Sequence, residues 1–289
     1  FLEDPRTIAS GGTVRIANGC TVDSGFLTSV GLPRNLLALF QIVEYLRAFL
    51  FGRLGWSPLN AVLIISGAFG VFRKDVVVKA GGYRTDTVGE DMELIVRLHR
   101  LYRTGNIPYR IVFVPDPVCW TEAPETLRVL KNQRVRWQRG LAESLTLNIG
   151  LLFHRHGGAA GWLAFPFMII VEAMSPIIEM LGLIFTIVLA CFGYINASAS
   201  LLFLAASVGM GLLLSSLALV LEERSFHVYP RFRDTATLFL WAVLENFGYR
   251  QLNSWWRLQG TWHWLRGTEA KWGTMVRNTS WMTEDTPAK

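Results

Sequence analysis

The chain has 289 residues, of which 51% are hydrophobic and only 17% are charged, against roughly 25% charged residues in soluble globular domains. This composition excludes a disordered chain and argues against a purely soluble protein. The net charge is +6, and the three cysteines, Cys20, Cys119 and Cys191, show no C-x-x-C or Cys/His spacing. A disulfide-stapled secreted module and a zinc site are therefore excluded. No signal peptide follows Phe1, so we expect the chain to begin inside a longer protein.

Charge divides the chain into three zones. Residues 1–156 carry 19 basic and 13 acidic side chains, whereas residues 157–221 carry only Glu172 and Glu179. Residues 222–289 are again mixed, with nine basic and seven acidic groups and many tryptophans. We expect domains at about 1–156, 157–222 and 223–289.

Strand and helix signals alternate along the first zone. Residues 13–17 and 61–66 look like strands, and residues 110–114 form a third strand that Pro115 and Pro117 are expected to stop. Apolar spacing predicts helices over residues 36–51 and 92–102, and Pro124 with Glu125 is expected to open another. The alternation predicts an α/β sandwich.

The second zone is long enough to cross a bilayer, which takes about 20 apolar residues per helix. We expect a kinked or interfacial helix from residue 162 to about Ser175, a span over 177–194 and a second span over 201–221. Basic residues on both flanks place those flanks in the cytoplasm. A buried helical core is the alternative.

The segment 235–249 is ambiguous because it is short and contains Glu245 and Asn246. A single crossing here would put the arginines that follow on the outer side, so an interfacial or re-entrant segment is preferred. The tryptophans that follow this segment are expected at headgroup depth: Trp255, Trp256, Trp262 and Trp264.

Gly89-Glu90-Asp91 stands where a loop meets a predicted helix. A carboxylate held there could act as a general base facing a cleft. Helix N-termini also attract carboxylates for structural reasons, so a capping role for Asp91 is an equal alternative.

The segment Gln133-Arg134-Val135-Arg136-Trp137 places an amide, a guanidinium and an indole on one helix face, at Gln133, Arg136 and Trp137. Arginine binds phosphate oxygens in a bidentate manner, and an indole offers a flat surface to a sugar ring. The alternative is a basic helix snorkelling at a membrane surface.

These motifs in order, with Ser66-Gly67-Ala68-Phe69 before them and apolar helices after them, resemble the C-terminal part of membrane-embedded family 2 glycosyltransferases. The family includes the cellulose, hyaluronan, chitin and poly-N-acetylglucosamine synthases. Its (T/G)-(E/D)-D motif matches residues 89–91, and its Q-x-x-R-W motif matches Gln133, Arg136 and Trp137. Trp272, Gly273, Thr274 and Arg277 resemble the gating element Trp-Gly-Thr-Arg of hyaluronan synthases, with two extra residues before the arginine.

The resemblance implies an inverting GT-A-like transferase at the cytoplasmic face of the cell membrane, in a multi-pass protein. It implies that Asp91, with Glu90 beside it, supplies the catalytic base, that Trp137 stacks on the acceptor sugar, and that Gln133 and Arg136 hold the acceptor end and the diphosphate. Ser66 and Gly67 would border the acceptor pocket, and Trp272, Thr274 and Arg277 would close over the nucleotide. Trp272 as another interfacial anchor is the alternative.

The implied partners are a nucleotide-diphosphate sugar, a polysaccharide or oligosaccharide acceptor and the lipid bilayer, with no nucleic-acid polymer. The implied cofactor is Mg or Mn, bound through a D-x-D element that this sequence lacks. We therefore expect the metal site and the donor-binding half of the catalytic domain upstream of Phe1, with no metal ligands in this chain. The predicted function is polysaccharide synthesis, and coupling of this synthesis to export is a further expectation. A non-processive transferase and a non-catalytic membrane subunit are the alternatives.

Overall fold

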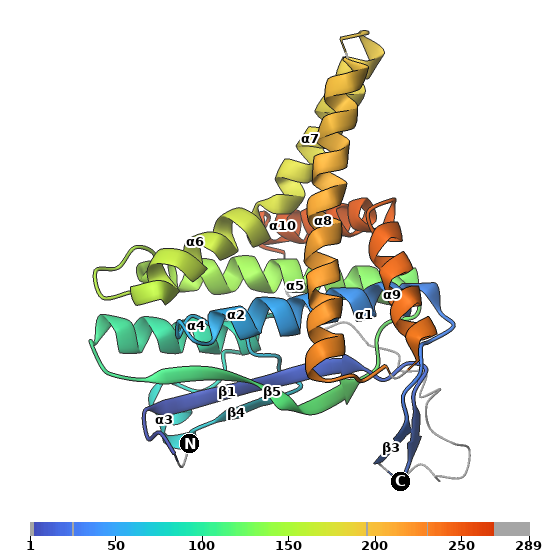
Figure 1. The fold of residues 1–289 in the computed structure, drawn as a ribbon. Helices are drawn as coiled ribbons and strands as arrows, with labels where there is room; N and C mark the ends of the chain where they lie inside the picture. The colour runs from blue at the N-terminus through green and yellow to red at the C-terminus, as the bar shows by residue number, and fades with distance from the viewer. Residues whose placement is uncertain (1–2, 25, 195, 230, 269–289) are drawn as a thin grey trace.

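The computed structural model describes residues 3–24, 26–194, 196–229 and 231–268. A small sheet lies at one side of the molecule, helices are stacked on it, and a hairpin of two long helices projects away from the sheet (Figure 1). The α/β character predicted for the first zone is confirmed.

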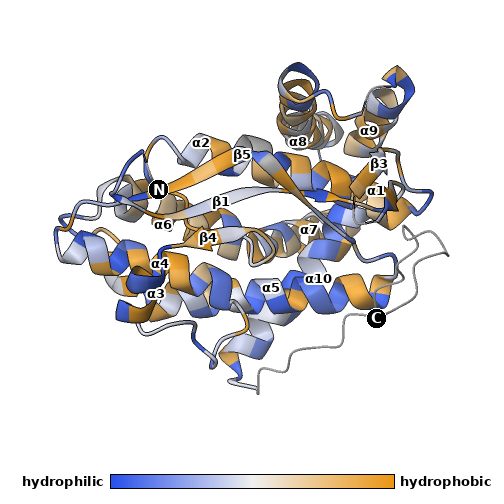
Figure 2. Ribbon diagram, turned by 90° about the horizontal axis from the view of Figure 1, so that it is seen from below, coloured by the Kyte–Doolittle hydropathy of each residue, from blue (hydrophilic) through white to orange (hydrophobic). Residues whose placement is uncertain are grey.

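The sheet has three strands in the order β4-β1-β5. β1 (Thr7–Ile16) is central; it is antiparallel to β4 (Gly70–Phe72) and parallel to β5 (Arg110–Thr121). β2 (Thr21–Asp23) and β3 (Phe26–Ser29) form a separate hairpin. Viewed from below, the three strands lie in front of most of the helices, which gather on the opposite face (Figure 2).

Two strand predictions were wrong. β5 does not stop at Pro115 and Pro117, because Gly12 pairs with Val114 and Thr13 with Val118, and the residues between form a bulge that needs no ladder hydrogen bonds. Residues 61–66 form no strand, although Ala61, Val62, Leu63 and Ile65 are all buried. A short apolar run indicates that its residues are buried, but it does not indicate whether they pair with another strand.

The helices of the first zone are close to those predicted. α1 (Leu36–Tyr45) is capped by the Asn35 side chain and continues as a π-helix, η1 (Leu46–Arg53), and a final turn, α2 (Leu54–Trp56). α3 (Lys74–Lys79) is short, and α4 (Glu90–Thr104) begins at the Gly89-Glu90-Asp91 motif.

α5 (Leu127–Leu147) begins three residues after Pro124, where the helix was expected to open. The Thr126 side chain caps the helix by accepting a hydrogen bond from the Val129 N–H, while Glu125 accepts one from Asn18 instead. The acidic first turn expected from Glu125 is therefore absent from this helix.

The apolar zone is helical throughout most of its length. After η2 (Ile149–Leu151), a series of short turns leads to α7: η3 (Ala160–Ala164), α6 (Phe165–Phe167) and η4 (Met168–Ala173). α7 (Ser175–Cys191) begins at the predicted break, and α8 (Ala197–Ser225) returns beside it.

Two helical segments, Ala160–Cys191 and Ser200–Ser225, are long and apolar enough to cross a bilayer. Only 11% and 19% of their most apolar windows are buried in the structure. The alternative of a buried helical core is therefore not observed.

α9 (Phe232–Leu244) packs against α8 and α1, and Gly248, with φ of 93°, reverses the chain into α10 (Tyr249–Leu265). α10 lies along α5 and beneath α7 (Figure 1). The expectation that Trp256 sits at headgroup depth was wrong, because it is only 6% exposed and packs with Leu130 and Tyr249. Trp255 and Trp262 are half-exposed.

The two acidic residues of the apolar zone both point to α10. Glu179 accepts a 2.6 Å hydrogen bond from the Ser254 hydroxyl and forms an ion pair with Arg250 at 3.3 Å. Glu172 forms an ion pair with Arg257 at 3.5 Å. Both charges are thereby matched by partners on α10.

The end of α8 is bound to the sheet by a buried ion pair. Arg15 of β1 and Glu222 of α8 are 2.5 Å apart, and both side chains are almost completely buried. A hydrophobic cluster next to them contains residues from the first zone, from the end of the apolar zone and from the zone after it. Its buried members are Ile16, Leu39, Ile42, Val43, Leu46, Ala123, Leu219, Tyr229, Leu238 and Ala242.

Candidate active site

Asp91 lies in the first turn of α4 and meets the turn after residues 61–66. Its Oδ2 accepts a 2.9 Å hydrogen bond from the Gly67 N–H, and its Oδ1 accepts one of 2.8 Å from the Met92 N–H. The structure thus brings together Asp91 and the Ser66-Gly67 turn, which are 24 residues apart.

These two contacts suit either role predicted for Asp91. Hydrogen bonds from backbone N–H groups hold the carboxylate in one orientation at the start of a helix, as a cap would. A carboxylate has about four lone-pair positions, so two remain for a substrate proton. Asp91 is partly exposed, and its role as a base stays a prediction.

The charge of Asp91 affects two titratable groups next to it, Glu90 and Tyr83. Burial raises the pKa of Glu90, the negative charge of Asp91 adds to this rise, and Arg136 opposes it. Glu90 and Arg136 come from the two predicted motifs, so this interaction shows that the motifs are close in space. Tyr83 belongs to the same group, because its pKa is raised by burial and by the charges of Asp91 and Glu90. No sequence pattern singled out Tyr83.

The predicted face of α5 is only partly open to solvent. Gln133 is buried, whereas Trp137 is 41% exposed and presents a ring surface. The guanidinium of Arg134 lies over this ring, 4.7 Å from its centroid. Arg134 therefore supports the indole from one side.

Arg134 is itself held by Glu44 of α1. The two side chains are 2.5 Å apart and mostly buried. Glu44 also accepts hydrogen bonds of 2.9 Å from the Tyr249 hydroxyl and from the Asn253 amide of α10. Through Arg134, three helices support the position of Trp137, and sequence reasoning had identified neither Glu44 nor Arg134 as important.

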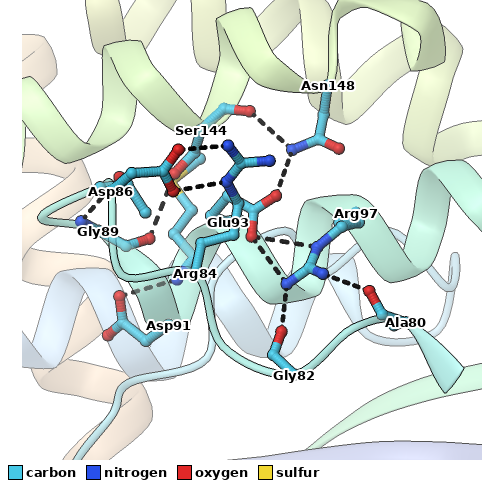
Figure 3. A network of polar contacts seen from close by, with 12 residues as sticks. Ala80, Gly82, Arg84, Asp86, Gly89, Asp91, Glu93, Arg97, Ser144 and Asn148 are labelled. Atoms are coloured by element: carbon cyan, nitrogen blue, oxygen red, sulfur yellow. Dashed lines mark hydrogen bonds and ion pairs between the residues drawn. The ribbon is translucent and has the colours of Figure 1, made fainter. Parts of the chain in front are cut away.

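A polar network fixes the loop that leads into α4 (Figure 3). The buried Glu93 binds Arg97 at 3.0 Å and accepts a 3.2 Å hydrogen bond from Asn148. Arg97 in turn donates to the backbone carbonyls of Ala80 and Gly82. The start of the loop, at Ala80 and Gly82, is therefore hydrogen-bonded to α4, the helix that carries Asp91.

Arg53 is another cation near Asp91 that the sequence did not reveal. Its guanidinium stacks on the Phe49 ring at 3.7 Å, and its Nη1 is buried without a hydrogen-bond partner. Burial lowers the Arg53 pKa to about 10, while the charge of Asp91 opposes the shift. Sequence spacing gave no signal because Arg53 lies in η1, away from both motifs.

The residues that the structure describes do not fit a divalent metal site. Among them, no group of three or more histidine, cysteine, aspartate or glutamate side chains is arranged to hold an ion. The predicted gating residues Trp272, Thr274 and Arg277 lie outside the described residues.

The fold and the two adjacent motifs define a glycosyltransferase-type domain, and sequence comparison agrees. The profile described as "Glycosyl transferase family group 2" matches residues 13–244, and the chain belongs to this family. The predicted membership of the family 2 glycosyltransferases is thereby confirmed.

Curated relatives match half of this chain. The poly-beta-1,6-N-acetyl-D-glucosamine synthase of Staphylococcus aureus (strain COL) is 35% identical over 147 residues, which are 50% of this chain and 30% of that protein. The synthase of the same name from Staphylococcus epidermidis is 30% identical over 145 residues, with the same two shares. The chain thus spans about a third of the length of these relatives.

Among solved structures, the chain is similar to the mannosyltransferase PcManGT from Pyrobaculum calidifontis, in complex with GDP-Man and Mn2+. The sequence identity is 17% and the TM-score 0.43, over 93% of this chain and 56% of that one.

Proposed function

We propose that this chain carries the acceptor side of a GT-A-like transfer site that adds N-acetylglucosamine to a growing polysaccharide at a membrane. The observation that carries the proposal is the contact of Asp91 with the Gly67 turn, together with the backbone contact between Gly89 and Gly140 that brings this site to the helix of the exposed Trp137. The choice of sugar is supported by the names of the relatives, which are poly-beta-1,6-N-acetyl-D-glucosamine synthases.

In the proposed reaction, Asp91 takes the proton of an acceptor hydroxyl. The acceptor oxygen then attacks C1 of the donor sugar from the face opposite the leaving group, so the configuration inverts. The bond from C1 to the nucleotide diphosphate breaks, and the diphosphate leaves with the electron pair. Trp137 offers the surface on which the acceptor ring stacks, and Arg136 supplies positive charge for the diphosphate or the acceptor end. Mg or Mn remains the cofactor proposed for the donor side.

We propose further that the α7–α8 hairpin crosses the membrane and anchors this site at the cytoplasmic face, where the product could enter an export path. α7 has 17 residues and is therefore about 25 Å long, close to the thickness of a bilayer's hydrocarbon core. Basic and histidine residues flank the hairpin on both sides, which favours the same compartment for both flanks: His154, Arg155, His156, Arg224, Arg231 and Arg233.

The deciding experiment replaces the base. In the intact protein, Asp91→Asn keeps the size of the side chain and an oxygen for one of its two backbone N–H contacts, but it cannot accept the proton. We expect transfer of sugar from a panel of radiolabelled nucleotide sugars to fall roughly 100-fold to 10,000-fold, with donor binding retained.

The matched control is Asp75→Asn, which removes a carboxylate from an exposed ion pair with Arg73 and should leave transfer unchanged. Near wild-type transfer by Asp91→Asn would return Asp91 to a capping role. The length of the products separates polymer synthesis from single transfer, and a wild-type protein that binds but transfers nothing would favour a non-catalytic subunit.

A further inference from the structure

Two glycines meet where the loop before α4 touches α5. A Cβ atom on Gly140 would lie 2.8 Å from the Cα and 2.9 Å from the N of Gly89. A Cβ on Gly89 would likewise lie 2.8 Å from the Gly140 Cα. The two backbones are therefore in direct contact, at a separation that no larger residue at either position permits.

Polar contacts also hold the loop to α5 next to this point. Glu143 Oε2 accepts hydrogen bonds from the Thr87 hydroxyl at 2.7 Å and from the Val88 N–H at 3.0 Å. The other oxygen of Glu143 is held by Arg139 at 2.6 Å. The Ser144 hydroxyl donates to the Gly89 carbonyl at 3.3 Å (Figure 3).

The same helix carries the predicted acceptor platform. Gly140 follows Arg136 by four residues and Trp137 by three, so the contact point lies on their side of the helix, about one turn further on. On the other side of the contact, Gly89 precedes Asp91 by two residues. A short, rigid path of backbone thus joins the base to the acceptor platform.

We propose that Gly140 and Glu143 are positioning residues of the transfer site, which set the distance between Asp91 and the acceptor face of α5. This inference rests on the function proposed above. Neither residue touches substrate in this scheme; Gly140 sets the separation of the two elements by contact, and Glu143 keeps the loop from moving away. A role in packing alone would affect the amount of folded protein but not the turnover of each folded site.

The test is Gly140→Ala in the intact protein, with Gly55→Ala as the matched control. The control makes the same change on α2, where an added Cβ meets nothing within 4 Å. The new methyl at Gly140 must push the loop away by about half an ångström to one ångström, and a displacement of that size costs up to about 100-fold in rate.

We expect kcat per donor-binding site to fall roughly 10-fold to 100-fold in Gly140→Ala, with the donor KM within about twofold of the wild type. Gly55→Ala should match the wild type in both. Unchanged kcat per site in Gly140→Ala would overturn the proposal, and so would a loss of donor binding in proportion to the loss of rate.

Glu143 provides a second test that adds no bulk to the contact. Glu143→Ala frees the loop and should lower kcat per site several-fold. Glu143→Gln retains an oxygen acceptor for Thr87 or Val88 and should recover most of that rate. If Gly140→Ala does not fold, the two Glu143 variants provide the test. A kcat per site equal to that of the wild type in both Glu143→Ala and Glu143→Gln would overturn the proposal.

Failure of this inference and failure of the proposed function give different results. If Asp91→Asn is inactive while Gly140→Ala and Glu143→Ala turn over normally, only the positioning role is wrong. If Asp91→Asn is fully active, the base itself is wrong, and the inference is overturned with it.

Discussion

The buried carboxylate of Glu44 should contribute more to stability than any exposed ion pair of this protein. It pairs with Arg134 and also accepts hydrogen bonds from Tyr249 and Asn253, so it is the point at which α1, α5 and α10 meet. Glu44→Ala leaves the buried guanidinium without its counter-charge and leaves two further donors unsatisfied. Breaking a buried pair in this way costs about 3–5 kcal/mol.

For a protein of this size, that loss corresponds to a fall in melting temperature of roughly 6–20 °C. The assay is thermal unfolding of the intact protein in one detergent, followed by circular dichroism. Asp75→Ala, which breaks the exposed pair with Arg73, serves as the control and should cost at most about 1 kcal/mol.

The double variant Glu44→Ala/Arg134→Met removes both charges and should regain part of the lost stability, because no unpaired ion is then buried. Glu44 does not stabilise this junction if Glu44→Ala melts no lower than Asp75→Ala. A double variant that is less stable than Glu44→Ala by the full cost of a second, independent loss would contradict the pairing with Arg134.

Two further outcomes are expected. Trp137→Ala should raise the KM for acceptor roughly 2-fold to 10-fold and leave that for donor unchanged, since the indole stacks on a sugar ring while charge holds the diphosphate; a rise in donor KM alone would contradict this role. Burial lowers the pKa of His99 to about 4, so the unfolded chain, with an ordinary value near 6.5, binds a proton first as the pH falls. The contribution of neutral His99 to stability should therefore be fully present above about pH 6.5, and the free energy of unfolding should fall by about 2 kcal/mol at pH 5. Melting curves at pH 7 and pH 5 would detect this fall. It should be smaller in His99→Gln, and an equal fall in that variant would assign it to other groups.

The parts of the site that were predictable are those that lie close together along the chain. Helical spacing places Gln133, Arg136 and Trp137 on one face of α5, and the loop-to-helix junction locates Asp91 at the start of α4. The support of Trp137 by Arg134 was not predictable, because it depends on Glu44, which is 90 residues away. Two neighbouring arginines in a helix look alike until the partner of one of them is known.

The errors in the predicted fold have the same origin. Pro115 is tolerated in β5 only because the partner strand skips it, and a single strand does not reveal how its partner pairs. Trp256 was assigned to a membrane surface from its neighbours in the sequence, yet it fills a space beside Leu130 that α5 creates. Hydrophobicity indicates that a side chain leaves water and does not indicate which surface receives it.

The ion pair between Arg15 and Glu222 has a consequence for biosynthesis. The two residues are 207 positions apart, so at translation rates of 5–20 residues per second Glu222 is made roughly 10–40 s after Arg15. Until then β1 carries a guanidinium with no counter-ion, and the cluster beside it lacks Leu219, Tyr229 and Leu238. The ribosome therefore delivers both long apolar helices before the sheet can complete its core. For this chain, synthesis of the hairpin precedes maturation of the domain from which it projects.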